Sequence, residues 1–425
     1  MRSPLTAVDA RGRAPHHGAV SLAPETLGAL LRRYEGPGEP LACRPLAHGL
    51  LNRGYRLATT RGQYFLKHHL AGDQAAIARQ HRATWRLAGL GVPVAPPVAA
   101  ADGSTVTVLG GRCYALHPWV EGVHRDGGDL TAPQSRRLGT LLGLVHVRLA
   151  RVMRAETGTE SGSETGSETG TATDAGTATG PAAEPHPSGP RLPGPRAASP
   201  APPPAPAPPP VRPPRLVPGG WYGAAAGDTG PAGSPTPPDP ADTFALIDEL
   251  LLLAGRRRPR DAFDELAEHR LIERRALIER HAHRRPTAPA TPPASWVHGD
   301  FHPLNLLYRG AEPAAIVDWD RLGVQPRAEE AVRAAAIFFV RPGGTLALTK
   351  VRPYARGYRA ATGASPQEMA AAVHRVWWER LNDFWILRWR YQRGDHRADP
   401  QFPAVAALAV WWTDHYEAVC QAFCD

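Results

Sequence analysis

The feature that most constrains the fold of this chain is the stretch 298–305, which reads His-Gly-Asp-Phe-His-Pro-Leu-Asn. Short apolar runs of strand type lie around it and are bounded by turn residues; they cover 295–297, 306–308 and 315–317. Strands on both sides leave the stretch itself as a connecting loop. We therefore expect Asp300 and Asn305 on a loop between strands, and Asp318 at the end of a strand.

These three residues carry the groups that phosphoryl transfer requires. Transfer of a γ-phosphoryl group needs an acceptor held in line, Mg²⁺ on the phosphate oxygens, and a carboxylate that takes the acceptor's proton. Asp300 suits the last role. Mg²⁺ prefers oxygen ligands and usually takes only one or two from the protein, so Asn305 and Asp318 suit the metal.

Two other interpretations of the stretch are open. His298 and His302 lie four residues apart and could ligate zinc on a helix, but Gly299 and Pro303 argue against a helix there. Alternatively, Asp300 could have a purely structural role and cap backbone amides in a buried turn, which is a common use of aspartate. The match at three spaced positions favours phosphoryl transfer over both.

The pattern His-Gly-Asp-x-x-x-x-Asn, followed by an apolar strand and Asp318, resembles the aminoglycoside phosphotransferase and choline kinase-like family of the protein-kinase fold. The resemblance implies an α+β, bilobal protein kinase-like fold with a small β-rich N-lobe, a larger and mainly helical C-lobe, and ATP in the cleft. It implies Asp300 as catalytic base, and Asn305 and Asp318 as Mg²⁺ ligands. The acceptor would be a hydroxyl or amine of a small molecule, such as an aminoglycoside-type antibiotic or a metabolic amino alcohol.

The same family has an ATP-contacting lysine on an N-terminal strand, and Lys67 ends a run of strand formers at 63–67. Lys67 and Lys350 are the only lysines among 49 lysines and arginines. A lysine kept in so arginine-rich a chain indicates that a compact ammonium is needed, since the two cations are not interchangeable as phosphate partners. The alternative is chance placement of one of two lysines.

A turn at 46–57 lies where the family covers the nucleotide phosphates. Gly49, Asn52 and Gly54 in this turn could offer backbone N–H groups to phosphate oxygens, although glycine and asparagine mark any hairpin turn. We assign Gly49 and Asn52 to cofactor binding.

The chain departs from the family at the helix expected over 73–89. There the family pairs its lysine with a glutamate, and Gln80 is the counterpart here. An amide can hydrogen-bond Lys67 but cannot supply the charge of an ion pair. A catalytically weak or inactive nucleotide-binding or scaffold protein is therefore the alternative function. Asp73 could serve as the N-cap of the helix.

Residues 155–240 are expected to form a disordered Pro/Gly-rich insert. A Gly-Ser-Glu-Thr repeat opens it, and 181–240 hold 22 of the 46 prolines, too many for a packed domain. The insert would interrupt the C-lobe, which gives these units: 1–118, N-terminal nucleotide-binding lobe with about 20 disordered residues at its start; 119–154, start of the C-terminal lobe; and 241–425, catalytic and acceptor-binding lobe. A protein partner of the proline tract is an open possibility.

Turn and cap residues predict further elements. Residues 104–117 indicate a hairpin with Gly110-Gly111 at its turn, and 131–153 indicate a helix. Asp242 and Asp261 are expected N-caps of two more helices.

Beyond Asp320 the pattern is helical, and this region would hold the acceptor. Glu379 and Asp383 lie four residues apart on one helix face and, with nearby tryptophans, could receive a cationic acceptor. The alternative is that the tryptophans fill a core and the acids are solvated. Asp320 could assist the metal or the substrate, or cap the following turn.

Composition limits the remaining classes. The net charge of +9 comes from scattered arginines without a nucleic-acid motif, so nucleic-acid binding has no support beyond charge. Four cysteines show neither zinc nor disulfide spacing, which favours a reducing cytoplasm. No apolar run approaches the roughly 18 residues of a membrane span. ATP and Mg²⁺ are the expected cofactors, a small-molecule acceptor the expected partner, and the cytoplasm the expected location.

Overall fold

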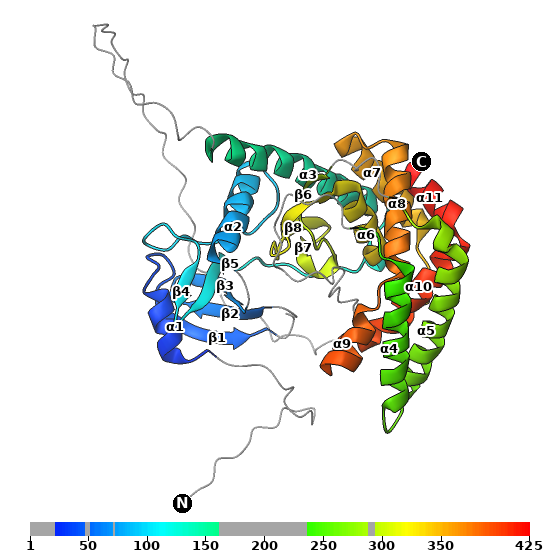
Figure 1. The fold of residues 1–425 in the computed structure, drawn as a ribbon. Coiled ribbons are helices and arrows are strands. Elements are labelled where there is room, and N and C mark those ends of the chain that lie inside the picture. Colours follow the sequence, from blue (N-terminus) through cyan, green and yellow to red (C-terminus); the bar gives the residue numbers. More distant parts are fainter. Residues whose placement is uncertain (1–21, 47–51, 71–72, 161–235, 288–293) are drawn as a thin grey trace, which may run out of the picture.

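The computed structural model describes residues 22–46, 52–70, 73–160, 236–287 and 294–425 (Figure 1). The predicted disordered start, Gly49 and most of the predicted insert lie outside these ranges. The described residues form two lobes, a sheet at one side and a larger group of helices at the other (Figure 1). The bilobal α+β prediction is confirmed.

The N-lobe is built on one antiparallel sheet in the order β1-β2-β3-β5-β4. Its elements are α1 (Pro24–Leu31), β1 (Pro40–Pro45), β2 (Arg53–Thr59), β3 (Gly62–His69), α2 (Gln74–Gly89), β4 (Thr107–Leu109) and β5 (Arg112–Pro118). The predicted β4–β5 hairpin is confirmed. Its turn has φ of 56° at Gly110 and 72° at Gly111, the left-handed pair that a two-residue hairpin needs. Asp73 caps α2 by accepting from the amide of Ala75.

The C-lobe is mainly helical and carries two small antiparallel strand pairs, β6–β9 and β7–β8. Its strands are β6 (Ala294–Val297), β7 (Leu306–Arg309), β8 (Glu312–Ile316) and β9 (Gly323–Pro326). Its α-helices are α3 (Ala132–Glu160), α4 (Pro240–Arg256), α5 (Ala262–His281), α6 (Arg327–Phe338), α7 (Leu348–Thr362), α8 (Pro366–Leu381), α9 (Trp385–Arg393), α10 (Phe402–Asp414) and α11 (Tyr416–Cys424). Short 3₁₀ turns cover Gly127–Asp129, Ala282–Arg284, Pro303–Asn305 and Asp399–Gln401.

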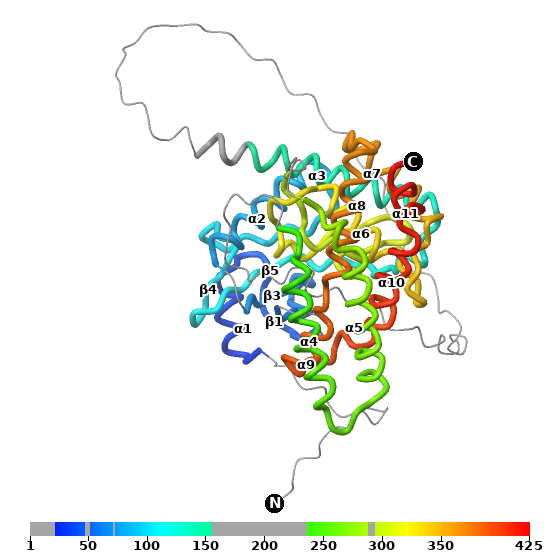
Figure 2. The backbone as a smooth tube through the Cα atoms, turned by 45° about the vertical axis from the view of Figure 1, so that its right-hand side comes forward, coloured from blue at the N-terminus to red at the C-terminus, as the bar shows by residue number. Residues whose placement is uncertain are grey.

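The start of α4 differs from the prediction. Its N-cap is Asp239, which accepts from the amide of Ala241, and Asp242 lies in the first turn instead. A proline at the first helical position suits the earlier start. Asp261 does cap α5, in a capping box with Asp264. α4 and α5 then run as a hairpin (Figure 2), joined by an ion pair between Asp248 and Arg275.

The two ends of the predicted insert, 155–160 and 236–240, belong to the described structure of the C-lobe. Helix α3 continues to Glu160, and residues 236–239 pack on the C-lobe. Arg285 pairs with Asp239, and the indole of Trp378 donates to the carbonyl of Pro238 at 3.0 Å. Among the described residues, no helix is long and apolar enough to cross a membrane.

Helices α3 and α7 approach each other more closely than side chains would allow. A Cβ on Gly139 of α3 would lie 2.0 Å from the carbonyl oxygen of Tyr354, and one on Gly357 of α7 would lie 2.2 Å from that of Arg136. Glycine at both positions therefore permits backbone to pack on backbone. This contact joins the helix before the insert to one near the end of the chain.

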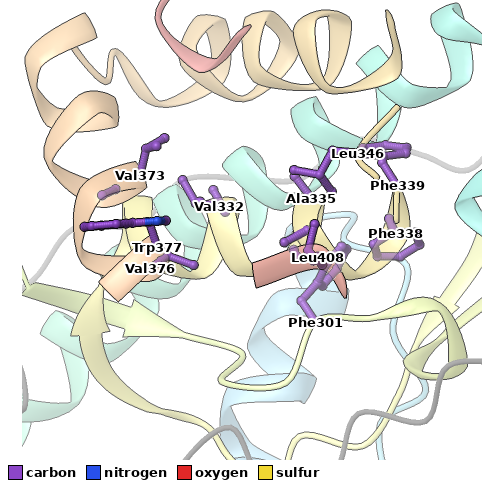
Figure 3. Packing of buried hydrophobic residues seen from close by; sticks show 14 of the residues in the cluster. Phe301, Val332, Ala335, Phe338, Phe339, Leu346, Val373, Val376, Trp377 and Leu408 are labelled. Carbon is purple, nitrogen blue, oxygen red and sulfur yellow. The ribbon is translucent and has the colours of Figure 1, made fainter. Parts of the chain in front are cut away.

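The core of the C-lobe lies between α6, α8 and the loop at 298–305 (Figure 3). Trp377, Trp378 and Trp412 have no exposed surface, and Phe301 reaches the same cluster from the loop at 298–305. The prediction that the tryptophans fill a helical core is confirmed. The loop is thereby anchored to the hydrophobic core of the lobe.

Candidate functional site

The loop at 298–305 is tied to the segment that carries Asp318. Asn305 ends the 3₁₀ turn, and its side-chain nitrogen Nδ2 donates to the backbone carbonyl oxygen of Asp300 at 2.9 Å. The carbonyl of Asn305 accepts from the amide of Val317 at 2.9 Å, and the ring of His298 contacts the carbonyl of Val317 at 3.1 Å. Asp300, Asn305 and Asp318 therefore belong to one connected structure.

The absence of a side chain at Gly299 lets the loop lie close to the backbone of Arg321. Its φ is 82°, and a Cβ there would lie 2.0 Å from the carbonyl oxygen of Arg321, so only glycine fits. The Asp300 carboxylate lies 3.6 Å from the ring of His302 and 3.8 Å from Nε of Arg321. The loop therefore places the carboxylate of Asp300 beside the guanidinium of Arg321.

Glu330 supports the loop from α6, and sequence reasoning missed it. Its carboxylate accepts from the backbone amides of His298, at 3.2 Å, and Gly299, and pairs with Nε2 of His146 at 2.7 Å. Glu330 is 4% exposed and His146 1%. Burial acts to raise the pKa of Glu330, but His146 and the loop amides hold it below its usual value. The buried carboxylate thus fixes the start of the loop that carries Asp300.

Lys67 reaches the site from β3. Its ammonium lies 2.7 Å from Asp318 Oδ1 and 2.7 Å from Asp320 Oδ1, while its side chain is only 9% exposed. Burial acts to lower the pKa of Lys67, but the two carboxylates raise it above its usual value. Burial and the adjacent Asp318 raise the pKa of Asp320 to about 6, against the effect of Lys67. Burial acts to raise the pKa of Asp318 too, but there the ammonium of Lys67 outweighs burial and holds the pKa below its usual value.

Asp318 adopts an uncommon backbone. Its φ is 62°, in the left-handed region that costs a residue with a Cβ about 1 kcal/mol or more. Its side chain is 46% exposed although it pairs with Lys67. The conformation places a partly accessible carboxylate beside the lysine.

Asn52 and Gln80 both lie at this site, but their contacts differ from those expected. Asn52 donates to the carboxylate of Asp320 and accepts from the amide of Leu70 at 3.0 Å. The amide of Gln80 donates to the backbone carbonyl of Asp320 at 3.0 Å. The expected hydrogen bond from Gln80 to Lys67 is therefore replaced, in the described part of the chain, by one to Asp320.

Glu379 and Asp383 are separate from this group. Glu379 pairs with Arg333 at 2.9 Å, and one oxygen of Asp383 accepts from the amide of Trp385 at 3.1 Å. Burial raises the pKa of Asp383 to about 6 and that of Glu379 above its usual value. The alternative that these acids are solvated holds only in part, because both are half-buried in the helix packing that buries the tryptophans. Within the described ranges, neither acid bonds to Asp300.

The donor set fits a magnesium ion. The nitrogen of the Asn305 amide is held by the backbone, which leaves the amide oxygen as its ligand atom, and Asp318 offers a carboxylate. The described residues contain no cluster of three or more histidine, cysteine, aspartate or glutamate side chains able to hold a metal. Mg²⁺ does not need one, because it retains several waters and binds phosphate oxygens. Zinc on a His298–His302 helix is excluded, because those residues lie on a loop and a 3₁₀ turn.

Three imidazoles lie next to Lys67 between β3, α2 and β5. The ring centroids of His69 and His81 are 6.4 Å apart, and those of His81 and His117 are 5.6 Å apart. Burial, followed by neighbouring positive charges, lowers the pKa of His69 and of His81 to about 3. Both side chains are therefore neutral in the folded protein at neutral pH.

We expect these two histidines to make the fold sensitive to mild acid. Unfolded histidine takes up a proton near pH 6.5 and the folded one only near 3, so the unfolded state binds more protons between these values. Stability must fall as the pH falls through this window, by about 1.4 kcal/mol per histidine between pH 7.5 and 5.5. Urea unfolding at both pH values measures the loss. It should shrink in His69→Asn and stay unchanged in the exposed control His415→Asn; an equal loss in all three proteins would contradict the prediction.

Comparison with known proteins identifies the family. The model of the phosphotransferase enzyme family matches residues 42–364. A homoserine kinase from Neisseria meningitidis serogroup B is 30% identical over 131 residues, which span 31% of this chain and only 42% of that protein. The structure of spectinomycin phosphotransferase APH(9)-Ia with ADP and spectinomycin is 11% identical and covers 94% of this chain and 97% of its own, with a TM-score of 0.51. Since the family match extends over most of the sequence and includes the loop with Asp300, this chain belongs to the phosphotransferase enzyme family.

Proposed function

We propose that this phosphotransferase transfers the γ-phosphoryl group of ATP, bound with Mg²⁺, to a hydroxyl or amine of a small molecule. The observation that carries the proposal is the connected group of Asp300, Asn305, Asp318 and Lys67. It combines an acid that could take the acceptor's proton, two oxygen ligands for a cation and a buried ammonium for phosphate oxygens. Each group has the chemistry that one part of the transfer requires.

The proposed roles follow from the contacts. Lys67 holds the phosphates of the nucleotide, and Asp318 with the amide oxygen of Asn305 holds Mg²⁺. When bound, Mg²⁺ supplies positive charge that neutralises the phosphate oxygens. Asp300 orients the acceptor and takes its proton as the new bond to the γ-phosphorus forms and the bond from that phosphorus to the leaving ADP oxygen breaks. Glu330 keeps Asp300 in place through the loop amides.

For the acceptor we propose a small molecule with a hydroxyl group, either an amino alcohol or an aminoglycoside-type antibiotic. The homoserine kinase relative supports an amino alcohol, although the match spans less than half of that protein. The likeness to spectinomycin phosphotransferase supports the fold alone. Glu379 and Asp383 are the least supported acceptor contacts, since their bonds in the described structure are internal to the helices.

Calorimetry of nucleotide binding tests the proposal directly. Wild-type protein should bind ATP more tightly with Mg²⁺ than without it. Asp318→Ala should weaken the Mg²⁺-dependent binding at least tenfold, or about 1.4 kcal/mol, because it removes the carboxylate ligand. Asp248→Ala is the matched control, since Asp248 is 66% exposed and pairs with Arg275 on the α4–α5 hairpin. Wild-type protein that binds no nucleotide under any condition would sink the proposed function.

A further inference from the structure

Asp320 lies in the C-lobe and is contacted by three polar side chains of the N-lobe. One of its carboxylate oxygens lies 2.7 Å from the ammonium of Lys67, and the other accepts from the side chain of Asn52. Its backbone carbonyl accepts from Gln80 at 3.0 Å. These donors come from three different N-lobe elements: the end of the β1–β2 connection, β3 and α2. Both oxygens of the carboxylate are thus occupied by the opposite lobe.

Lys67 needs such a partner because its charge is buried. An ammonium that is only 9% exposed is strongly disfavoured unless a carboxylate compensates it. Helix α2 supplies none, since Gln80 is neutral and its amide is bound to Asp320 rather than to Lys67. The two available carboxylates are Asp318, 46% exposed, and Asp320, 23% exposed. If Asp318 binds the cation of the nucleotide, Asp320 is the acid that remains for Lys67.

We propose that Asp320 is the positioning residue of Lys67, and that it supplies from the C-lobe the negative charge that α2 lacks. The proposal rests on the proposed function in one respect, that Lys67 serves the nucleotide phosphates. It assigns to Asp320 neither a metal nor a substrate. Because the counter-charge belongs to the other lobe, the lysine is correctly placed only while the two lobes are closed on each other.

Binding of ATP in EDTA separates this role from a role in metal binding. Asp320→Asn keeps the shape of the side chain and removes its charge, so ATP affinity without Mg²⁺ should fall about tenfold, or about 1.4 kcal/mol. The Mg²⁺ concentration that gives half-maximal turnover should not change. Asp248→Asn, the same substitution on the exposed hairpin, should leave both quantities unchanged. Unaltered affinity in EDTA together with a raised Mg²⁺ requirement would overturn the proposal and make Asp320 a metal ligand.

A second experiment restores the missing negative charge on α2. In the Asp320→Asn background, Gln80→Glu returns an acid to α2 next to residue 320, and it should recover most of the lost ATP affinity. A purely structural role of Asp320 would not be rescued in this way. Equal affinities of the single and double variants would count against replacement of the helix acid by Asp320.

A third measurement needs no nucleotide. In urea unfolding of the ligand-free protein, Lys67→Met and Asp320→Asn should each lower the urea concentration at the midpoint. The double variant should lower it by less than the sum of the two single shifts. Additive shifts would refute the pairing. Wild-type protein without nucleotide binding would refute the proposed function instead, and this cycle would still decide whether Asp320 holds Lys67.

Discussion

Replacement of Asp300 by asparagine should lower turnover about 10³-fold, within the range that a positioned general base contributes. The substitution keeps the shape of the side chain and removes its negative charge, and with it the capacity to take the acceptor's proton. The backbone carbonyl of Asp300 still accepts from Asn305, so the cation ligands should stay in place. ATP affinity in the presence of Mg²⁺ should therefore remain within about twofold of wild type.

Two assays are needed to read this result. Single-turnover kinetics with saturating ATP report the chemical step, and calorimetry reports binding. Asp248→Asn serves again as the control, because it makes the same substitution at an exposed position of the C-lobe. Turnover of Asp300→Asn within tenfold of wild type would exclude Asp300 as the base. Loss of binding and turnover together would indicate a role in folding of the loop.

Truncation of Glu330 to alanine should reduce the free energy of unfolding by about 3–5 kcal/mol, because it leaves several buried hydrogen-bond donors without their acceptor. The change leaves the amides of His298 and Gly299 without their acceptor, and His146 without its carboxylate. Buried donors without acceptors are costly. Since the loop carries Asp300, turnover should fall as well.

Urea unfolding measures the loss, with Glu312→Ala as the control. Glu312 is 63% exposed and pairs with Arg137 on the surface, where an ion pair contributes at most about 1 kcal/mol. Glu330→Gln keeps an acceptor oxygen and should fall between Glu330→Ala and wild type. If Glu330→Ala and Glu312→Ala cost the same, Glu330 does not support the loop.

Local patterns predicted the parts of the fold that depend on neighbours in the sequence. Apolar runs bounded by turn residues predicted β6, β7 and β8, and therefore the loop with Asp300. The Gly110-Gly111 pair predicted the β4–β5 hairpin because only positive φ closes so short a turn. Asp239 was missed as the cap of α4 because Asp242, three residues later, also stands directly before an amphipathic run.

The missing parts of the site depend on contacts between distant residues. Glu330 lies in a run of alanine, glutamate and arginine that is typical of an exposed helix, and nothing in it reveals His146 as a partner across the lobe. Gln80 was correctly placed near Lys67, but its hydrogen bond goes to a backbone carbonyl that no sequence pattern marks. Partial burial of Glu379 was missed because its partner Arg333 lies on another helix, α6.

The glycine contact between α3 and α7 has a consequence for synthesis of the protein on the ribosome. Helix α3 packs against α7 through Gly139 and His146, and it also carries the buried apolar side chains of Leu142, Val145 and Leu149. Residues 348–362 leave the ribosome long after residue 160, so the nascent chain must carry an uncovered apolar helix in the meantime. The C-lobe can close only late in translation, and a newly made chain would depend on chaperones during that interval more than its finished fold suggests.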